Sequence, residues 1–132
     1  MILLRDYQNR AVERLSESCE RLLKSPENEV CVFQAPTGSG KTIIVAEFLK
    51  SFVKNRKDQR KFSFIWVSVR KLHDQSKDKL ERYYENDRLL TCSYFEDLID
   101  KKLDENEILF INWHSINKKD INIYVKDNEH DN

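Results

Sequence analysis

The eight residues from Ala35 to Thr42 combine small, cationic and hydroxyl side chains in an order that suits phosphate binding. They read Ala-Pro-Thr-Gly-Ser-Gly-Lys-Thr and contain both glycines of the 132-residue chain, Gly38 and Gly40. Average usage would give about nine glycines in a chain of this length, so the backbone freedom of glycine is concentrated in one loop. A loop with few side chains lets successive backbone N–H groups converge on phosphate oxygens.

The flanks of this loop fit the same chemistry. An apolar, β-branched run predicts a buried strand over residues 30–34, and a helix is expected from residue 42 to about 53. The helix start would add N–H groups and the positive end of its dipole. Lys41 would be the catalytic cation on the β/γ-phosphates, and the hydroxyl of Thr42 would be a ligand of Mg²⁺. The residues assigned to the nucleotide phosphates are Pro36, Thr37, Gly38, Ser39, Gly40, Lys41 and Thr42.

Strands and helices that alternate along the chain would position this loop. Apolar spacing predicts helices over residues 6–24, 42–53 and 71–84, and a Ser-x-x-Glu capping box at Ser93 and Glu96 predicts a further helix over residues 93–103. Strands are expected at residues 30–34, 62–67, 89–92 and 108–111. This alternation indicates an α/β fold with a parallel sheet flanked by helices.

Composition narrows the class of protein. The mean hydropathy is −0.71, and no apolar run reaches the ~20 residues of a membrane span. Three cysteines without close spacing favour a reducing cytoplasm over a disulfide framework or a zinc site. Residues 50–82 carry a net charge of +7, between flanking stretches of −1 and −6. Such a basic stretch is either a solvated helix face or a surface for a polyanion.

Three segments resemble the motifs of superfamily-two helicases and translocases. The loop Ala35–Thr42 resembles their motif I, although the general pattern opens with Gly where this chain has Ala35. Upstream, Arg5-Asp6-Tyr7-Gln8 is similar to the element that precedes motif I. The resemblance implies that Gln8 reads the edge of the adenine and that Arg5 or Tyr7 stacks on the base. Without the resemblance, Gln8 would be a solvated residue at a helix start.

Downstream, the segment that ends in Arg70-Lys71-Leu72 and Gln75 resembles motif Ia, with Ser68 and Val69 in place of Pro and Thr. The resemblance implies that Arg70 and Lys71 contact the phosphates of a nucleic acid. The alternative is a pair of solvated charges at a helix start.

The segment Phe110–Ile116 resembles the family's strand-plus-Thr element, with Asn112 in place of Thr, and in this form it is most similar to the helicase (Res) subunit of type III restriction enzymes. Asn112 would contact the nucleic-acid strand. Trp113 would either stack on a base or pack in the core.

The resemblance implies a P-loop NTPase, RecA-like fold, of which the chain would hold an incomplete N-terminal half. Residues 1–29 would be the Gln-motif helix, 30–116 the P-loop α/β core and 117–132 a polar tail. The family's Asp-Glu-x-His after an apolar strand is absent from the sequence, and Asp127–His130 lacks its adjacent acidic pair. The second motor domain is also absent, so we expect weak nucleotide binding and little turnover.

The leading hypothesis is therefore the ATP-binding part of a superfamily-two DNA helicase or translocase. Its expected cofactors are ATP and Mg²⁺. Its expected partners are DNA, the remainder of a two-domain motor and a modification (methyltransferase) subunit, with no membrane. A non-catalytic nucleotide-binding remnant or interaction module is the alternative. A small kinase is a third reading, but it would need neither Gln8 nor the Arg70–Gln75 segment.

Overall fold

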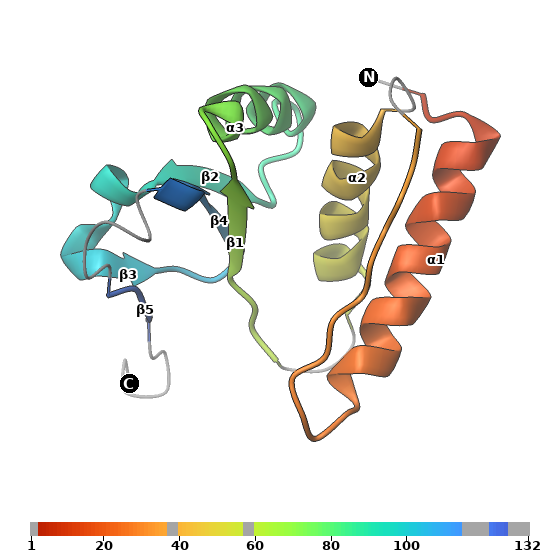
Figure 1. The fold of residues 1–132 in the computed structure, drawn as a ribbon, viewed down its shortest axis with the longest axis horizontal. Coiled ribbons are helices and arrows are strands. Elements are labelled where there is room, and N and C mark those ends of the chain that lie inside the picture. The colour runs from red at the N-terminus through yellow and green to blue at the C-terminus, as the bar shows by residue number, and fades with distance from the viewer. Residues whose placement is uncertain (1–2, 37–39, 57–59, 115–121, 127–132) are drawn as a thin grey trace. The chain divides into compact units, whose positions relative to one another are not determined.

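The computed structural model describes residues 3–36, 40–56, 60–114 and 122–126 of the chain (Figure 1). The chain divides into two compact units, Met1–Arg56 and Lys57–Asn132. The first unit contains the segments on either side of the Gly38–Gly40 loop, and the second contains a parallel sheet.

Two helices form the body of the first unit, α1 (Asp6–Leu23) and α2 (Lys41–Lys54), and they pack against each other. Both predicted helices are confirmed to within a residue at each end. Apolar residues that recur every three or four positions give each helix a face to bury. The buried residues are Val12 of α1 and Ile44, Ala46, Leu49 and Phe52 of α2.

An ion pair ties the far ends of α1 and α2 together. Arg56 Nη1 lies 2.7 Å from Glu20 Oε1, and the Arg56 guanidinium lies 4.6 Å from the centroid of the Phe52 ring. The Arg56 side chain is only 9% exposed, so the pair is shielded from solvent better than most surface ion pairs.

The strand predicted for residues 30–34 is wrong in this structure. Residues 28–36 have no regular secondary structure, and Val30 and Val32 are 85% and 77% exposed. A strand exists only where a neighbouring strand accepts its backbone hydrogen bonds. The described residues of the first unit are otherwise helices, turns and their connections, so this apolar run finds no such neighbour within the unit.

The second unit is built on a three-stranded sheet with the order β1-β4-β2, formed by β1 (Phe64–Ser68), β2 (Thr91–Tyr94) and β4 (Glu107–Asn112). Both β1 and β2 pair in parallel with β4, which confirms the predicted α/β class with a parallel sheet. The helix predicted for residues 71–84 is confirmed as α3 (Leu72–Tyr83), and it packs against all three strands.

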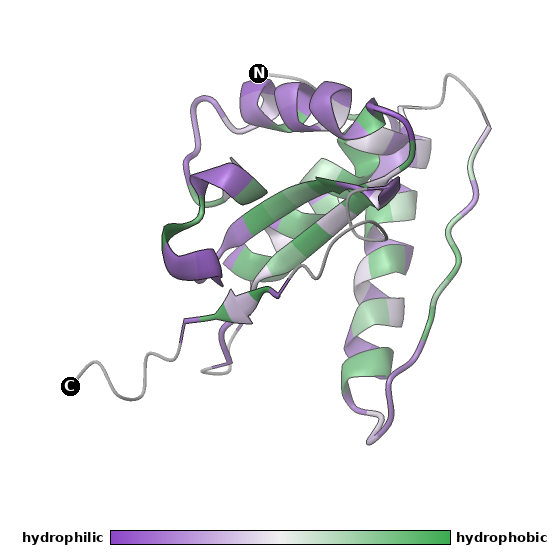
Figure 2. Ribbon diagram, turned by 60° about the vertical axis from the view of Figure 1, so that its left-hand side comes forward, coloured by the Kyte–Doolittle hydropathy of each residue, from purple (hydrophilic) through white to green (hydrophobic). Residues whose placement is uncertain are grey.

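The central strand β4 carries the core of the second unit. Ile108, Leu109, Phe110 and Ile111 are consecutive and all buried. This run without polar alternation is typical of a strand covered on both faces. Figure 2 shows the hydrophobic colour concentrated on these strands, whereas α3 is mostly hydrophilic. On one face Phe110 stacks on Trp66 with ring centroids 5.5 Å apart. On the other face Leu109 and Ile111 pack with Leu103.

The helix predicted for residues 93–103 is also wrong. The chain instead forms two 3₁₀ turns, η1 (Phe95–Asp97) and η2 (Ile99–Lys101), and a short strand β3 (Lys102–Leu103), which pairs in parallel with β5 (Tyr124–Val125). Asp100 and Lys101 have left-handed φ values of 55° and 58°, which an α-helix cannot contain.

The capping interaction at this turn occurs one residue later than the sequence suggested. Asp97 Oδ2 accepts a 2.9 Å hydrogen bond from the backbone N–H of Tyr94. Ser93 belongs to β2 instead, where it is buried and its hydroxyl donates to Glu107 Oε2 at 2.5 Å. The half-buried Glu107 carboxylate therefore accepts from the hydroxyl that would have capped the predicted helix.

Candidate functional site

Gly40 is the N-cap residue that joins the glycine loop to α2. Its φ of 81° and ψ of 40° are left-handed, and its carbonyl accepts the first hydrogen bond of α2, 2.9 Å from the N–H of Ile44. Gly40 has no side chain with which to cap the helix, and the first turn of α2, which the structure describes in full, contains no acidic residue. The N-terminus of α2 therefore keeps a positive potential that would attract an anion.

Gln8 of α1 lies directly on this turn. A Cβ atom built on Gly40 would be 2.6 Å from Gln8 Nε2, so a side chain at position 40 would require the Gln8 carboxamide to shift. The other end of the same carboxamide, Gln8 Oε1, accepts a 2.9 Å hydrogen bond from the backbone N–H of Arg5. The structure thus brings together two residues that the sequence assigned to one nucleotide site.

The structure describes three of the other predicted phosphate-binding residues. Lys41 is exposed and Thr42 is half-buried, both in the first turn of α2, while Pro36 is exposed on the other flank. Three of the predicted phosphate-binding residues lie outside the described part of the chain: Thr37, Gly38 and Ser39.

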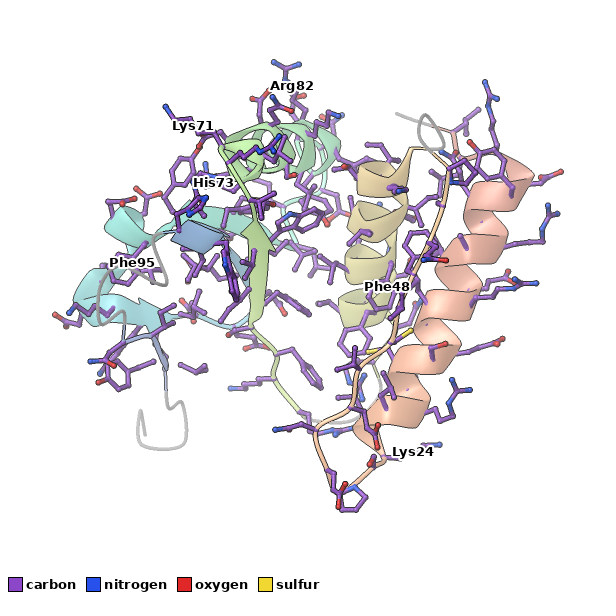
Figure 3. The ribbon with its side chains drawn as sticks, in the orientation of Figure 1. Lys24, Phe48, Lys71, His73, Arg82 and Phe95 are labelled. Carbon is purple, nitrogen blue, oxygen red and sulfur yellow. The ribbon has the colours of Figure 1, made fainter. Side chains whose placement is uncertain are left out.

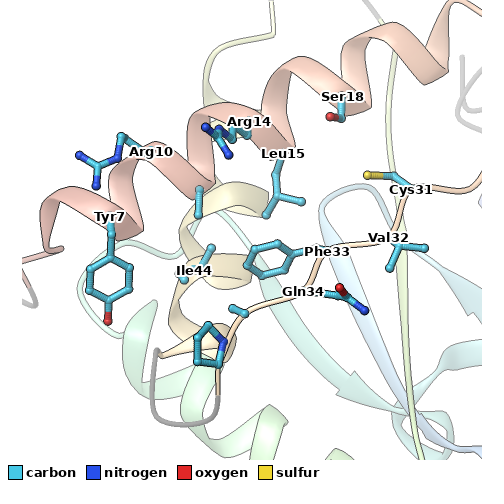
Figure 4. Close-up of a pocket in the computed structure, with 13 residues that line it drawn as sticks. Tyr7, Arg10, Arg14, Leu15, Ser18, Cys31, Val32, Phe33, Gln34 and Ile44 are labelled. Atoms are coloured by element: carbon cyan, nitrogen blue, oxygen red, sulfur yellow. The ribbon is translucent and has the colours of Figure 1, made fainter.

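A cavity of about 460 Å³ adjoins this turn within the first unit (Figure 4). Residues of α1, the extended segment 31–36 and Ile44 of α2 line it, and two of them, Tyr7 and Pro36, were predicted to bind nucleotide. Leu15 and Phe33 supply apolar surface. A cavity with apolar walls and a few polar groups is the common form of a small-molecule site.

Two arginines that the sequence analysis missed also line this cavity. Arg10 and Arg14 of α1 are one helical turn apart and follow Tyr7 on the same face. Spacings of three and seven residues from Tyr7, which place them one and two helical turns along the same face, were the signal that could have identified them. Their charges would favour an anionic ligand.

In the second unit, the predicted nucleic-acid residues meet at the carboxyl edge of the sheet. Ser68 of β1 and Asn112 of β4 are register partners on adjacent parallel strands. Arg70 and Trp113 follow these two residues in the chain, so both leave the sheet at the same edge, where α/β sheets bind their ligands. Asn112 Oδ1 accepts a 3.0 Å hydrogen bond from the N–H of His114.

The side chains at this edge are accessible. Arg70 and Lys71 are exposed, and Lys71 projects outward at the start of α3 (Figure 3). Arg70 has a left-handed φ of 55°, a conformation that is unfavourable for a residue with a side chain. Trp113 is 48% exposed, which rules out the core position that the sequence left open for it.

A further cluster, unnoticed in the sequence, surrounds Tyr94 at the end of β2. Its hydroxyl donates to Asp74 Oδ1 at 2.7 Å, and Lys77 Nζ lies 4.4 Å from its ring centroid. The ring of His73, which Figure 3 labels, is edge-to-face with the Tyr94 ring, and the two ring centroids are 6.0 Å apart. The hydrogen bond to Asp74 raises the pKa of Tyr94 to about 12, and burial adds to this shift.

Neither the Cys92 thiol nor a cluster of metal-ligating side chains adds a reactive site to the described part of the chain. Burial raises the pKa of the Cys92 thiol to about 12, so the thiol is protonated at neutral pH. In the described ranges, no three His, Cys, Asp or Glu side chains come together as a metal site.

The comparisons with known proteins give one match. The family described as "Type III restriction enzyme, res subunit" matches residues 1–132, the whole chain. No curated protein and no solved structure matches. Among the described helices, none has the length and apolar character that crossing a bilayer requires.

Proposed function

Because the chain belongs to the family of type III restriction enzyme res subunits, we propose that it is the ATP-binding part of a superfamily-two DNA helicase or translocase. The observation that carries this proposal is the left-handed Gly40 at the uncapped start of α2, with Gln8 packed on it. A P-loop requires a side-chain-free turn that leads directly into a helix N-terminus.

The residues around this turn fit Mg·ATP. Lys41 begins α2 and is exposed, so its ammonium group would neutralise the β- and γ-phosphates. Thr42 lies in the same turn, and its hydroxyl is the kind of oxygen ligand that Mg²⁺ prefers. Mg²⁺ would supply further charge neutralisation on the phosphates. At the start of α1, Gln8 would contact the edge of the adenine, and Arg5 or Tyr7 would stack on it.

The same proposal assigns DNA binding to the carboxyl edge of the second unit's sheet. Arg70 and Lys71 would contact backbone phosphates, and Asn112 and Trp113 would contact the strand and its bases. This assignment is supported by the shared edge and by the exposure of Arg70, Lys71 and Trp113. Binding of this kind would be independent of sequence and sensitive to salt.

The proposed partners follow from the proposed motor. They are DNA, the remainder of a two-domain motor and a modification (methyltransferase) subunit, in the cytoplasm. Within the chain, residues 1–29 would form the Gln-motif helix, 30–116 the P-loop core and 117–132 a polar tail. The sequence contains no apolar strand followed by Asp-Glu-x-His, so we propose that binding, rather than turnover, is the activity to measure for these 132 residues.

Thermal denaturation with Mg·ATP tests the nucleotide site. A ligand at about 100 times its Kd stabilises a folded protein by roughly 2.7 kcal/mol, so the unaltered chain should show a higher Tm with Mg·ATP. Lys41→Gln should remove this shift. Lys54→Gln is the matched control, because it removes the same charge from the last turn of α2. An equal shift in Lys41→Gln and the unaltered chain would contradict the proposal, as would no shift at all in the unaltered chain.

A further inference from the structure

The chain enters α3 through Arg70 and Lys71, and these two residues are held only weakly by their own turn. Lys71 is the N-cap residue of α3 and makes no side-chain cap hydrogen bond. Arg70 has the unfavourable left-handed φ of 55°. The backbone N–H of Asp74 bonds to the carbonyl of Lys71 at 3.2 Å, the long end of the usual range. The position of this turn therefore depends on contacts from elsewhere in the second unit.

Tyr94 at the end of β2 supplies such contacts. Its hydroxyl donates to Asp74 Oδ1 at 2.7 Å, and the Lys77 ammonium group lies 4.4 Å from the centroid of its ring. The His73 ring is edge-to-face with it, with the centroids 6.0 Å apart (Figure 3). Three side chains from the first two turns of α3 thus meet on one aromatic side chain of the sheet.

Tyr94 itself is fixed by the sheet. It is the register partner of Phe110, which is 1% exposed in the central strand β4. Its backbone N–H donates to Asp97 Oδ2 at 2.9 Å. A strand that is paired with the core is a firmer support than an uncapped turn, so the hydrogen bond to Asp74 fixes the start of α3 relative to β2.

The charge of Asp74 is unfavourable at the proposed DNA edge. The residue follows Lys71 by three positions, and its side chain is 50% exposed. On charge alone, its carboxylate would repel the phosphates that Arg70 and Lys71 attract. A positioning role predicts the opposite effect, because the same carboxylate accepts the Tyr94 hydroxyl. The sign of the change in DNA affinity when Asp74 is replaced therefore separates the two effects.

We propose that Tyr94 and Asp74 are positioning residues of the DNA site: their hydrogen bond holds the start of α3, so that Arg70 and Lys71 contact neighbouring phosphates of one strand. This inference rests on the proposed function, because it concerns the DNA edge assigned there. It adds two residues that carry no positive charge and that act on the DNA only through Arg70 and Lys71.

Fluorescence anisotropy of labelled oligothymidylate at several salt concentrations tests this role on the 132-residue chain. Tyr94→Phe removes the hydroxyl and keeps the ring, and we expect it to weaken binding by about three- to tenfold, the equivalent of one hydrogen bond. The slope of log K against log salt should fall in magnitude by about 0.7 for each phosphate contact that is lost from a single strand.

Two substitutions of Asp74 test the same hydrogen bond from the other side. Asp74→Ala should weaken binding about as much as Tyr94→Phe, although it removes a negative charge. Asp74→Asn should restore the affinity, because a carboxamide oxygen can accept the same hydroxyl. Asp78→Ala is the matched control, since it removes the same charge one turn further along α3, where the carboxylate pairs with Arg82 Nη2 at 3.1 Å. It should not weaken binding.

Hydrogen exchange gives a second readout that does not involve DNA. In Tyr94→Phe, the backbone amides of residues 72–76 should exchange faster than in the unaltered chain, because the start of α3 has lost its support. The amides of residues 80–84, at the other end of α3, should keep their exchange rates. Unchanged exchange at residues 72–76 would overturn the positioning role.

The double variant Arg70→Ala/Lys71→Ala separates this inference from the proposed function. If the unaltered chain does not bind the oligothymidylate, or binds it no more tightly than the double variant does, the proposed DNA site fails and the positioning role fails with it. If the double variant loses affinity while Tyr94→Phe keeps it, the DNA site stands and the positioning role is overturned.

The two Asp74 variants give a further outcome that would overturn the positioning role. If both strengthen binding, Asp74 acts on the DNA through its charge alone. Urea denaturation of each variant shows that the affinities belong to folded chains. Should Asp74→Ala not fold, Tyr94→Phe and Asp74→Asn still decide the question, because one removes the hydrogen bond and the other keeps it.

Discussion

The hydroxyl of Tyr94 donates a 2.7 Å hydrogen bond to Oδ1 of Asp74, and this bond joins the carboxyl end of β2 to the first turn of α3. Lys77, one turn further along α3, places its ammonium group 4.4 Å from the centre of the Tyr94 ring. The ring is therefore held from two sides by one helix at the edge of the sheet. Because a carboxylate accepts a hydrogen bond only from the neutral phenol, Asp74 opposes the ionisation of Tyr94.

The pKa of Tyr94, raised to about 12, predicts how this contact responds to alkali. A pKa that is higher in the folded than in the unfolded state stabilises the fold below the unfolded value, near 10. That contribution should disappear as the pH rises through about 12. Asp74→Ala should return the pKa of Tyr94 toward 10. The difference in tyrosinate absorbance between each chain and its Tyr94→Phe variant measures this pKa. Glu85→Ala, which removes an exposed charge beyond α3, should leave it unchanged.

The turn before α2 predicts a second, thermodynamic result. Gly40→Ala should lower the free energy of unfolding by about 1–2 kcal/mol, since a left-handed residue with a Cβ costs that much. The contact between the new Cβ and Gln8 Nε2 at 2.6 Å should add to this cost. Urea denaturation measures the sum of these two costs as one change in the free energy of unfolding. Ser51→Ala, a small change in the last turn of α2, should alter the free energy of unfolding by no more than about 0.5 kcal/mol.

A double mutant separates the two contributions. When Gln8→Ala is already present, Gly40→Ala should cost less than it does in the unaltered chain, because only the left-handed strain remains. Equal costs in both backgrounds would show that Gln8 does not constrain position 40.

The elements that sequence analysis located correctly are those with a strong local signal. Helices α1 and α2 have apolar residues at three- and four-residue steps, and β4 is a continuous apolar run. In these elements the apolar pattern itself indicates which side chains are buried, so the sequence is enough to locate the element. The parallel pairing of β1 with β4 also followed, since helix α3 lies between these two strands in the chain.

The elements that were missed depend on distant partners. The run Val30–Phe33 has the composition of a strand, yet a strand also needs a neighbouring backbone, which the sequence does not specify. Ser93 and Glu96 have the spacing of a capping box, but Glu107 takes the Ser93 hydroxyl. The closeness of Gln8 to Gly40 could likewise not be predicted. The resemblance placed both residues at one site without indicating that they lie against each other.

Arg70 provides a third prediction, because its φ of 55° is a left-handed conformation that glycine adopts without strain. Arg70→Gly should raise the free energy of unfolding by about 1 kcal/mol relative to Arg70→Ala. Both variants should bind single-stranded DNA more weakly, and the salt dependence of log K should lose about one phosphate contact. Fluorescence anisotropy of labelled DNA at several salt concentrations measures this. Unchanged affinity in both variants would leave Arg70 as a solvated charge.

The two tryptophans of the chain predict a spectroscopic test of the proposed DNA edge. Trp66 is half-buried and stacks on Phe110 with ring centroids 5.5 Å apart, whereas Trp113 is 48% exposed. In Trp66→Phe, the remaining tryptophan fluorescence comes from Trp113 alone, and single-stranded DNA should quench it if a base stacks on the indole ring. Trp113→Ala should then weaken binding by about 1–3 kcal/mol with little effect on stability.

Phe110→Ala is the contrasting change, because it removes a buried ring from β4, the strand that precedes Trp113, and should cost about 3–5 kcal/mol of stability. If Trp113→Ala destabilises the chain as much as Phe110→Ala, Trp113 has a packing role and not a base-stacking role. If DNA leaves the Trp113 fluorescence unchanged while Arg70 variants still lose affinity, the strand follows Arg70 and Lys71 and does not reach the end of β4.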